Sequence, residues 1–322
     1  MKPESADWRP SAGIETLKAR AQLYGSVRAF FGAGGVQEVE TPILSRHATV
    51  DRHIESFSTV SGLWLQTSPE FAMKRLLAAG SGPIFQIARV FRLEEQGRHH
   101  NPEFSMLEWY RPGFDHHTLM EEVEALLQAC GAPSPPYERL SYAAAFQRYA
   151  GFDPHALTAA SLRERLAALG IDEPLGVTAD EADDRDFWLD LWMSLRIGPQ
   201  LGGEAPVFIY DFPASQAALA RVRAGTPPLA ERFELFWHGL ELANGFHELT
   251  DAGEQQRRFV ADQHWRAMRG RAVPPYDQNL IEALQNGLPP CAGVALGLDR
   301  LLMLLADQGS VADTLAFPSD RA

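Results

Sequence analysis

The alternation of apolar and polar positions along the chain predicts an ordered series of helices and strands. The first clear segment, IETLKARAQLYGSVRAFF (residues 14–31), has apolar positions at helical spacing and stops at Gly34 and Gly35. Such a run followed by a glycine stop predicts a long amphipathic helix. Its predicted buried stripe consists of Ile14, Leu17, Ala21, Tyr24, Val27 and Phe31.

A strand and a second helix are predicted next, after a short extended piece that ends at a proline. The segment LWLQTSPEFAMKRLLAAG contains a strand through Leu65 and then a helix with Ser68 as its N-cap. Pro69 occupies the first position of this helix, and Gly80 terminates it. Glu70 falls in the first turn, where it either complements the helix dipole or belongs to a site.

Two further strands enclose a loop that is rich in charged side chains. PIFQIARVFRLE is a nearly continuous apolar run and predicts a buried strand, on which Arg92 and Glu94 share one face. An arginine on a buried strand needs a partner, because an unpaired buried charge costs several kcal/mol. EFSMLEWYRP alternates and predicts an antiparallel neighbour. One face of this second strand carries Phe104, Met106, Glu108 and Tyr110.

The middle of the chain, about residues 112–205, has the pattern of a largely helical insertion. A helix is predicted from about Leu119 to Cys130, and the proline-rich connector GAPSPPYERLS after it is a candidate boundary. The acidic run DEPLGVTADEADDRD predicts a solvated surface rather than a site.

A strand, VFIYDF, and a hairpin follow the insertion. RFELFWHGLELANGFHELTD predicts a hairpin that turns near His238 and Gly239, so that Glu234 and Glu241 face each other directly or diagonally. Two carboxylates about 4 Å apart repel by roughly 4 kcal/mol at an effective dielectric constant of 20, and a divalent cation would turn that repulsion into binding. Two glutamates that point to water fit the spacing equally well. Gly245 is a predicted bulge that re-aims the strand.

The last informative segment, CAGVALGLDRLLMLLADQG, predicts a strand and an apolar helix that opens with Asp299 and Arg300. Gly293 and Gly297 lie along the strand, where they either let another group approach the backbone or serve strand–helix packing. Phosphate-binding loops carry their glycines in the loop instead, so this pattern differs from theirs.

Composition limits the functions that remain. The chain has 322 residues, 45% of them apolar, which suffices for one large domain or two. A net charge of −13 leaves no broad basic surface for a long nucleic acid, although a local patch stays possible. Neither a signal peptide nor a membrane span is predicted, which indicates a cytoplasmic protein. Cys130 and Cys291 lack metal-ligand spacing and predict buried free thiols.

Taken in order, these segments resemble the catalytic core of class II aminoacyl-tRNA synthetases. The first helix with Pro42 is similar to motif 1, FRLE with RHHNPEF to motif 2, and GVALGLDR to motif 3. TSPE, RHHNPEFSMLEWY and ELANGFHEL resemble the lysyl subgroup, over a length from about Ile14 to the end. The resemblance implies an α+β fold with an antiparallel sheet flanked by helices, and a homodimer formed through motif 1.

The resemblance also implies site residues for ATP and Mg²⁺. Arg92 and Arg300 would act on the phosphates as catalytic residues, and Glu234 with Glu241 would hold magnesium. Glu94 would read the adenine amino group, and Phe104 would stack on the ring. The full set implied for ATP is Arg92, Leu93, Glu94, His100, Asn101, Phe104, Glu241, Leu242, Gly297 and Arg300.

The remaining site residues fit a dicationic amino acid. Two ammonium groups in a partly dry site need buried anions in excess, which Glu70, Glu108 and Glu248 supply. Lysyl-tRNA synthetases carry a glycine where Ala295 stands here, and the added methyl group favours β-lysine over lysine. The implied substrate-binding set is Ser68, Pro69, Glu70, Glu108, Tyr110, Asn244, Phe246, Glu248 and Ala295.

A single catalytic domain over residues 1–322 is expected, because an anticodon-binding barrel of about 70 residues fits at neither end. The layout resembles stand-alone relatives of lysyl-tRNA synthetase that modify elongation factor P. That implies ATP-dependent, AMP-forming ligation of (R)-β-lysine to a lysine of this factor, with no tRNA. A truncated synthetase that acylates tRNA or a small molecule, and a non-catalytic paralogue that acts as a binding module, remain open.

Overall fold

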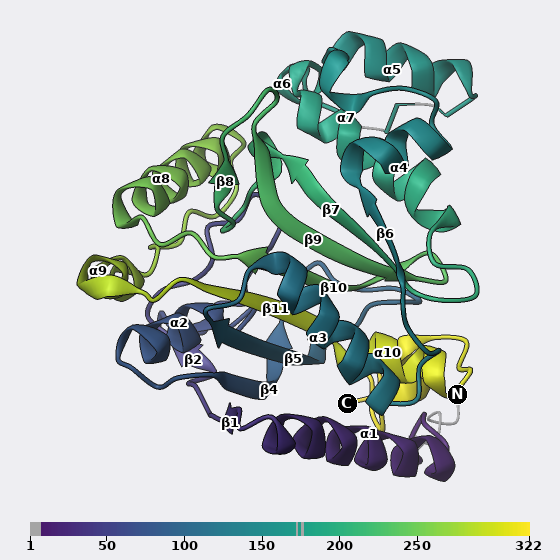
Figure 1. Cartoon of the computed structure of the whole chain (residues 1–322), viewed down its shortest axis with the longest axis vertical. Helices are drawn as coiled ribbons and strands as arrows, with labels where there is room; N and C mark the ends of the chain where they lie inside the picture. The colour runs from purple at the N-terminus through teal and green to yellow at the C-terminus, as the bar shows by residue number, and fades with distance from the viewer. Residues whose placement is uncertain (1–7, 172, 175–176) are drawn as a thin grey trace, which may run out of the picture.

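A central mixed sheet organises the molecule. The computed structural model describes residues 8–171, 173–174 and 177–322. Within these residues, nine strands form the main sheet in the order β1-β4-β5-β11-β10-β9-β7-β6, with β8 paired to β9 (Figure 1). Their bounds are β1 Gln37–Glu38, β4 Ile84–Phe91, β5 Glu103–Pro112, β6 Glu138–Ser141, β7 Val207–Pro213, β8 Val222–Arg223, β9 Leu229–Trp237, β10 Leu240–His247 and β11 Cys291–Gly297. A separate two-stranded sheet pairs β2 (Leu44–Ser45) with β3 (Trp64–Leu65).

Ten α-helices lie in the described part of the chain. They are α1 Ile14–Ala33, α2 Glu70–Ala78, α3 His116–Ala129, α4 Tyr142–Tyr149, α5 Ala159–Ala168, α6 Ala179–Asp183, α7 Arg185–Trp192, α8 Ala252–Met268, α9 Gln278–Gly287 and α10 Leu298–Leu305. A π-helical turn spans Met193–Ile197, and short 3-10 turns span Pro154–Ala156, Gly198–Gln200, Ala214–Gln216 and Val311–Thr314. None of these helices is long and apolar enough to cross a membrane.

The α+β class and the helix-flanked sheet are confirmed, with one refinement. The inner strands β4, β5, β11, β10, β9 and β7 pair antiparallel, as expected. At the two edges, β1 pairs with β4 and β6 with β7 in parallel, so the sheet is mixed. Both edge pairs join strands that are separated by a helix, which is the connection that parallel pairing requires.

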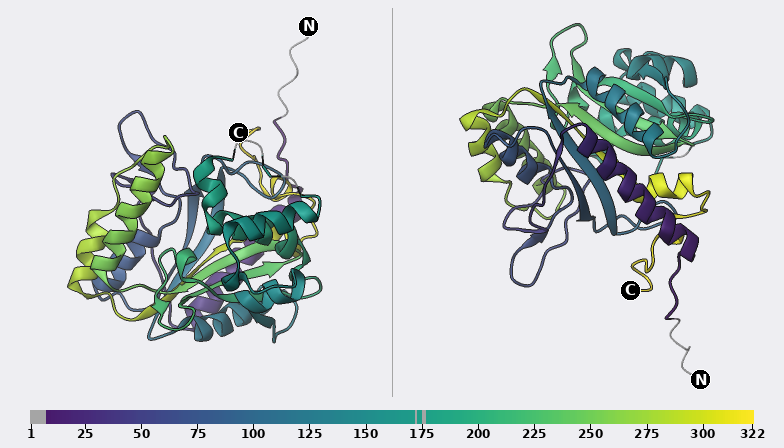
Figure 2. Two further views of the ribbon diagram at one scale, coloured as in Figure 1. Left: turned by 90° about the horizontal axis from the view of Figure 1, so that it is seen from above. Right: turned by 60° about the horizontal axis from the view of Figure 1, so that its bottom comes forward.

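The main core lies between one face of the sheet and the helices α1, α3 and α10. Phe31 of α1 stacks on Phe85 with ring centroids 4.6 Å apart, and it also contacts Trp109. The predicted stripe of α1 is only partly right, because Ile14 is 62% exposed and Ala21 is exposed. Figure 2 (right) shows α1 running across the underside of the sheet beside the C-terminal segment.

The opposite face of the sheet is bordered by two other groups of helices. α2, α8 and α9 pack together at one end, around Met73, Leu77 and Phe259. α4, α5 and α7 form a second apolar cluster against β6, β7 and β9 at the other end (Figure 1). Within residues 112–205, α3 belongs to the main core and β6 to the main sheet, so the proline-rich connector before β6 does not end the domain core.

The hairpin β9–β10 has the predicted turn but a different irregularity. His238 and Gly239 both have positive φ, 49° and 75°, which suits a tight hairpin turn. The register shift lies between Glu241 and Ala243, so the predicted bulge at Gly245 is wrong. Gly245 is needed for packing instead, because a Cβ there would lie 2.3 Å from the Phe233 ring.

The two cysteines are free. Cys291 on β11 is fully buried, and burial raises the pKa of its thiol to about 12. Cys130 follows the last turn of α3 and is half-buried, and burial raises the pKa of its thiol to about 11. The prediction of buried thiols is therefore right for Cys291 and only partly right for Cys130.

Candidate active site

A cavity of about 880 Å³ opens on the sheet face opposite the main core. It lies where β5, β11, β10 and β9 run side by side, and α2 and α8 contribute to its wall. Because residues two apart on a strand share a face, each strand sends several side chains into the cavity. The cavity brings together these predicted site residues: Ser68, Pro69, Glu70, Arg92, Glu108, Tyr110, Glu234, Glu241, Asn244, Phe246, Glu248 and Ala295.

Glu108 is a buried carboxylate with two hydroxyl partners. The Ser68 hydroxyl donates to its Oε2 at 2.7 Å, and the Tyr110 hydroxyl donates to its Oε1 at 2.6 Å. Burial, and then the nearby Glu70 carboxylate, raise the pKa of Glu108 to about 7. Ser68 also accepts from the backbone N–H of Glu70, but Pro69 holds the N-cap position, so the predicted cap lies one residue too early.

Lys74 is a site residue that sequence reasoning missed. Its ammonium group is 2.7 Å from Glu70 Oε1 and 2.5 Å from Glu248 Oε2, and its side chain is 2% exposed. These two carboxylates hold the pKa of Lys74 above its usual value despite burial. The i, i+4 spacing of Glu70 and Lys74 on α2 was a signal that could have found this pair.

Lys74 changes the charge balance that was expected for the cavity. With Lys74 charged, full ionisation of the three carboxylates, which bound ammonium groups would favour, gives two net negative charges to match the two ammonium groups of a lysine-like ligand. Burial raises the pKa of Glu248 to about 8, since Lys74 only partly offsets it. Glu248 Oε1 has no hydrogen-bond partner within the described part of the chain, so it is free to accept from a ligand.

Gly293 on β11 leaves room for the Tyr110 and Glu248 side chains. A Cβ at Gly293 would lie 2.2 Å from the Tyr110 ring and 2.7 Å from Glu248 Oε1, so glycine is required there. The group that approaches this strand is thus a protein side chain. Ala295 lies opposite Glu108 on one side and Asn244 on the other, and it lines the cavity.

Glu234 and Glu241 lie on the neighbouring strands β9 and β10, and both line the cavity. Burial, and then the charge of Glu241, raise the pKa of Glu234 to about 8. Arg232 forms an ion pair with Glu234 and also donates to the Asn244 side-chain oxygen at 3.2 Å. Glu241 has no place in a group of three or more candidate metal ligands within the described residues, so these carboxylates could hold an ion only together with other oxygen donors.

Arg92, His100 and Arg300 form a group of potential cations beside the cavity. The guanidinium of Arg92 lies over the Phe104 ring at 5.3 Å, and its Nη1 is 3.2 Å from Glu95. Arg300 is 2.5 Å from His100 and donates to the Glu241 carbonyl at 2.8 Å. Glu95, which was not predicted, lies within 4.0 Å of Arg92, His100 and Arg300 and so occupies the place of an anion among three potential cations.

Most residues implied for ATP, including members of this group, do not line the cavity. Arg92 and Glu94 follow the end of β4, so the prediction that they share a strand face is wrong. Asn101 is buried, and its amide bonds the Glu103 carbonyl and the Ser319 N–H. The residues outside the cavity lining are Leu93, Glu94, His100, Asn101, Phe104, Leu242, Gly297 and Arg300.

The acidic run before α7 also reaches the cavity. Glu181, Asp184 and Asp186 of this run line one wall together with Asp190 of α7, so this half of the run is not only a solvated surface. Burial raises the pKa of Asp190 to about 7, and Gln216 donates to its carboxylate at 2.9 Å. Three residues of the run, 172 and 175–176, lie outside the described part of the chain.

The arrangement can bind a cationic and an anionic group side by side. One part of the cavity presents buried carboxylates to ammonium groups, and the adjoining part presents arginine with a carboxylate pair. Preorganised arginine stabilises charge that develops on a phosphate, and carboxylate oxygens suit a hard dication. The geometry is therefore compatible with a reaction between an amino acid and a nucleoside triphosphate.

Comparison with known proteins gives a consistent picture. The family described as tRNA synthetases class II (D, K and N) matches residues 1–321. Elongation factor P--(R)-beta-lysine ligases from Salmonella paratyphi B (strain ATCC BAA-1250 / SPB7) and Salmonella agona (strain SL483) are each 51% identical over 328 residues. These alignments cover 99% of this chain and 99% of each relative.

Proposed function

Because the chain belongs to the class II tRNA synthetase family (D, K and N), we propose that it is an ATP-dependent ligase that joins (R)-β-lysine to a lysine side chain of elongation factor P. The main structural support for this proposal is that one cavity is lined both by the Glu70, Glu108 and Glu248 carboxylates and by Arg92. The relatives, whose printed name states this activity, support the choice of amino acid and acceptor.

The proposed reaction has two steps. In the first, the carboxylate of the amino acid attacks the α-phosphorus of ATP, which forms an aminoacyl-adenylate and releases pyrophosphate. In the second, the ε-amine of the acceptor lysine attacks the adenylate carbonyl, loses a proton and releases AMP, which leaves an amide. Arg92 and Arg300 would stabilise the charge that develops on the phosphates. Glu108, Glu248 and Tyr110 would hold the ammonium groups in place.

The carboxylate pair fits a magnesium ion. Glu234 is 8% exposed, and the charge of Glu241 on the adjacent strand helps to raise its pKa, so two hard oxygen donors lie close enough to repel each other. When bound there, Mg²⁺ would neutralise charge on the ATP phosphates. Arg232 would keep Glu234 oriented through the ion pair already present.

Incubation with ATP and β-lysine tests the proposal directly. Purified elongation factor P or total tRNA is added as acceptor, and the intact mass of each acceptor is measured. We expect β-lysine on the protein and none on tRNA. Charged tRNA would favour a truncated synthetase, and an absence of ATP–pyrophosphate exchange would favour a non-catalytic binding module.

A homodimer in the cytoplasm is part of the same proposal. α1, which carries the motif 1 resemblance, exposes apolar side chains such as Ile14 on the outside of the molecule. Sedimentation of the purified chain at micromolar concentration distinguishes a dimer from a monomer. A monomer that retains full exchange activity would remove the dimer from the proposal.

We expect Glu241→Gln to raise the magnesium concentration needed for half-maximal pyrophosphate exchange. The substitution keeps the shape of the side chain but removes the charge of one hard-oxygen ligand. Glu122→Gln is a matched control, because Glu122 pairs with Arg111 and does not line the cavity. An unchanged magnesium titration in Glu241→Gln would mean that this carboxylate does not hold the ion.

We expect Ala295→Gly to shift amino acid preference towards ordinary α-lysine. The Ala295 methyl group lies between Glu108 and Asn244, where an α-ammonium would need room. One methyl group changes discrimination by about 1–3 kcal/mol, or roughly 10- to 200-fold. The measurement is the ratio of kcat/KM for α-lysine and β-lysine in pyrophosphate exchange, with KM for ATP as the control. A ratio that stays constant would make Ala295 a packing residue.

A further inference from the structure

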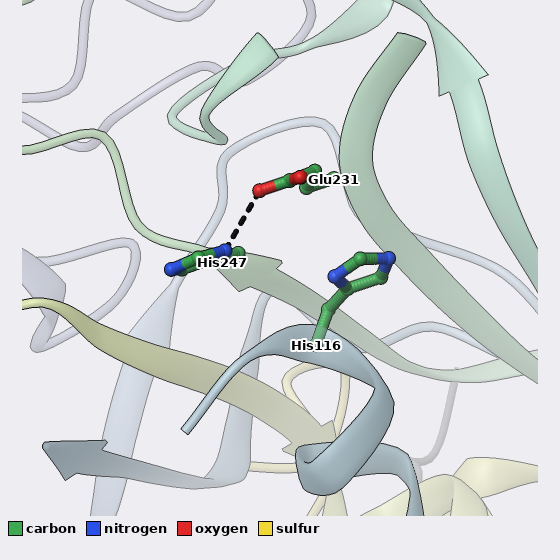
Figure 3. A group of neighbouring side chains, drawn as sticks. All are labelled: His116, Glu231 and His247. Carbon is green, nitrogen blue, oxygen red and sulfur yellow. Dashed lines mark hydrogen bonds and ion pairs between the residues drawn. The ribbon is translucent and has the colours of Figure 1, made fainter. Parts of the chain in front are cut away.

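A buried cluster of metal-type ligands lies outside the candidate active site. His116, Glu231 and His247 each offer one ligand atom, and these atoms all lie within 4.8 Å of one another. His116 comes from the first turn of α3, whereas Glu231 and His247 come from the neighbouring strands β9 and β10 (Figure 3). Among the residues that the structure describes, this is the one group of three or more such side chains with this geometry.

The cluster faces away from the cavity. On β10, Phe246 and Glu248 line the cavity, and His247 between them points to the other face of the sheet. On β9, Arg232 lines the cavity while Glu231 beside it does not. The cluster therefore lies on the α3 side of the sheet, behind the candidate active site and separate from the Glu234 and Glu241 pair.

His116 is the observation that points to a ligand. Its side chain is 3% exposed, and neither ring nitrogen makes a hydrogen bond within the described part of the chain. Asp211 Oδ1, 3.7 Å from His116 Nε2, is likewise buried without a hydrogen-bond partner. Burying such groups without a hydrogen bond is unfavourable, and a metal ion would satisfy the imidazole lone pair and the carboxylate oxygen together.

The arginines near Glu231 are exposed. Arg221 and Arg223 form ion pairs with Glu231 at 3.6 and 3.7 Å, which are longer than hydrogen bonds, and both side chains are at least 41% exposed, so they can turn towards solvent when a cation binds. Arg223 instead bonds Asp211 Oδ2 at 2.7 Å, which leaves Oδ1 facing His116. His247 Nδ1 and Glu231 form a hydrogen bond of 2.7 Å, which an ion bound between the two side chains would replace.

We propose that His116, Glu231 and His247 form a structural site for a transition-metal dication such as Zn²⁺. Two imidazoles and one carboxylate are a known zinc ligand set, and Asp211 or water would complete a tetrahedron. Zinc–ligand bonds of about 2.0–2.2 Å require ligand atoms roughly 3.4 Å apart, so the side chains, whose ligand atoms lie within 4.8 Å of one another, would draw together around the ion. The ion would tie the start of α3 to the β9–β10 hairpin behind Arg232, Phe246 and Glu248.

Cobalt spectroscopy tests this site directly. Chelator-treated protein is titrated with Co²⁺ in excess Mg²⁺, which occupies the active-site carboxylates. We expect visible ligand-field bands of a tetrahedral site with one Co²⁺ per chain. His116→Asn should weaken the affinity at least tenfold, since even the loss of an outer-shell partner costs about 10–100-fold. His117→Asn, which changes the ring next to His116, should bind Co²⁺ as the wild type does.

Thermal unfolding supplies a second readout. Zn²⁺ should raise the Tm of the wild type and of His117→Asn, but not of His116→Asn, because an ion that binds only the folded state stabilises it. If His116→Asn does not fold, Glu231→Gln, which keeps the side-chain shape, takes its place in both measurements. Absent ligand-field bands, or bands that persist unchanged in His116→Asn and Glu231→Gln, would overturn the site.

Discussion

Replacing Arg92 with alanine is expected to reduce amino-acid-dependent ATP–pyrophosphate exchange by at least about 100-fold, the loss typical for one preorganised transition-state donor. The side chain lines the cavity, its guanidinium lies over Phe104, and its Nε is buried without a hydrogen-bond partner in the described part of the chain. An arginine held in this way is ready to donate to a phosphate without reorganising, and so it acts on developing charge rather than on packing.

The fold should survive this substitution. The ion pair of Arg92 with Glu95 is 24–26% exposed at each side chain, and partly exposed pairs contribute about 0–1 kcal/mol. Arg98→Ala is the matched control, because Arg98 belongs to the same loop, bonds the Gly309 carbonyl and does not line the cavity. Exchange activity within threefold of wild type in Arg92→Ala would remove this residue from the mechanism.

Lys74→Met is expected to cost about 3–5 kcal/mol of unfolding free energy at pH 8, because it leaves two carboxylates buried without their cation. Lys74 is 2% exposed and contacts both Glu70 and Glu248. Adding Glu248→Gln to Lys74→Met should recover part of the lost unfolding free energy, since the more deeply buried of the two carboxylates is then neutral. Lys18→Met is the control, because Lys18 pairs with Glu15 on the surface, and its loss should cost under about 1 kcal/mol.

The cost of Lys74→Met should grow as pH rises. A carboxylate whose folded-state pKa is raised contributes stability that is fully present below its unfolded pKa and lost as pH rises through the folded value. Glu248 already has a folded pKa of about 8, and removal of Lys74 raises it further. The loss measured by urea unfolding should therefore be smaller at pH 6 than at pH 8. Equal losses at both values would mean that Lys74 acts through packing.

Local sequence determined most of the elements around the site. The alternation in EFSMLEWYRP predicted β5 with the observed bounds, and the hairpin turn at His238 and Gly239 followed from its flanking strands. These features depend on side-chain period and turn chemistry within about ten residues, so a short window contains the information. The resemblance to class II synthetases drew on the same short motifs, and it correctly indicated the family.

Tertiary structure decided which charges meet. Arg20 and Ser105 both contact Asp299, across 279 and 194 positions of sequence, and no local pattern predicts such partners. The same holds for the approach of Arg300 to Glu95 and for the acidic wall that α7 adds to the cavity.

His116 shows most clearly the difference between what local sequence predicts and what tertiary packing determines. The sequence predicted a helix only from about Leu119, whereas α3 begins at His116 and is capped by Asp115. Its proximity to Glu231 and His247 exists because α3 packs across the β9–β10 hairpin, more than 100 positions away. The spacing of apolar residues and the turn residues determine the helices and strands. Burial then brings polar groups from distant parts of the sequence together, and only the packed structure shows whether each of them has a hydrogen-bond partner.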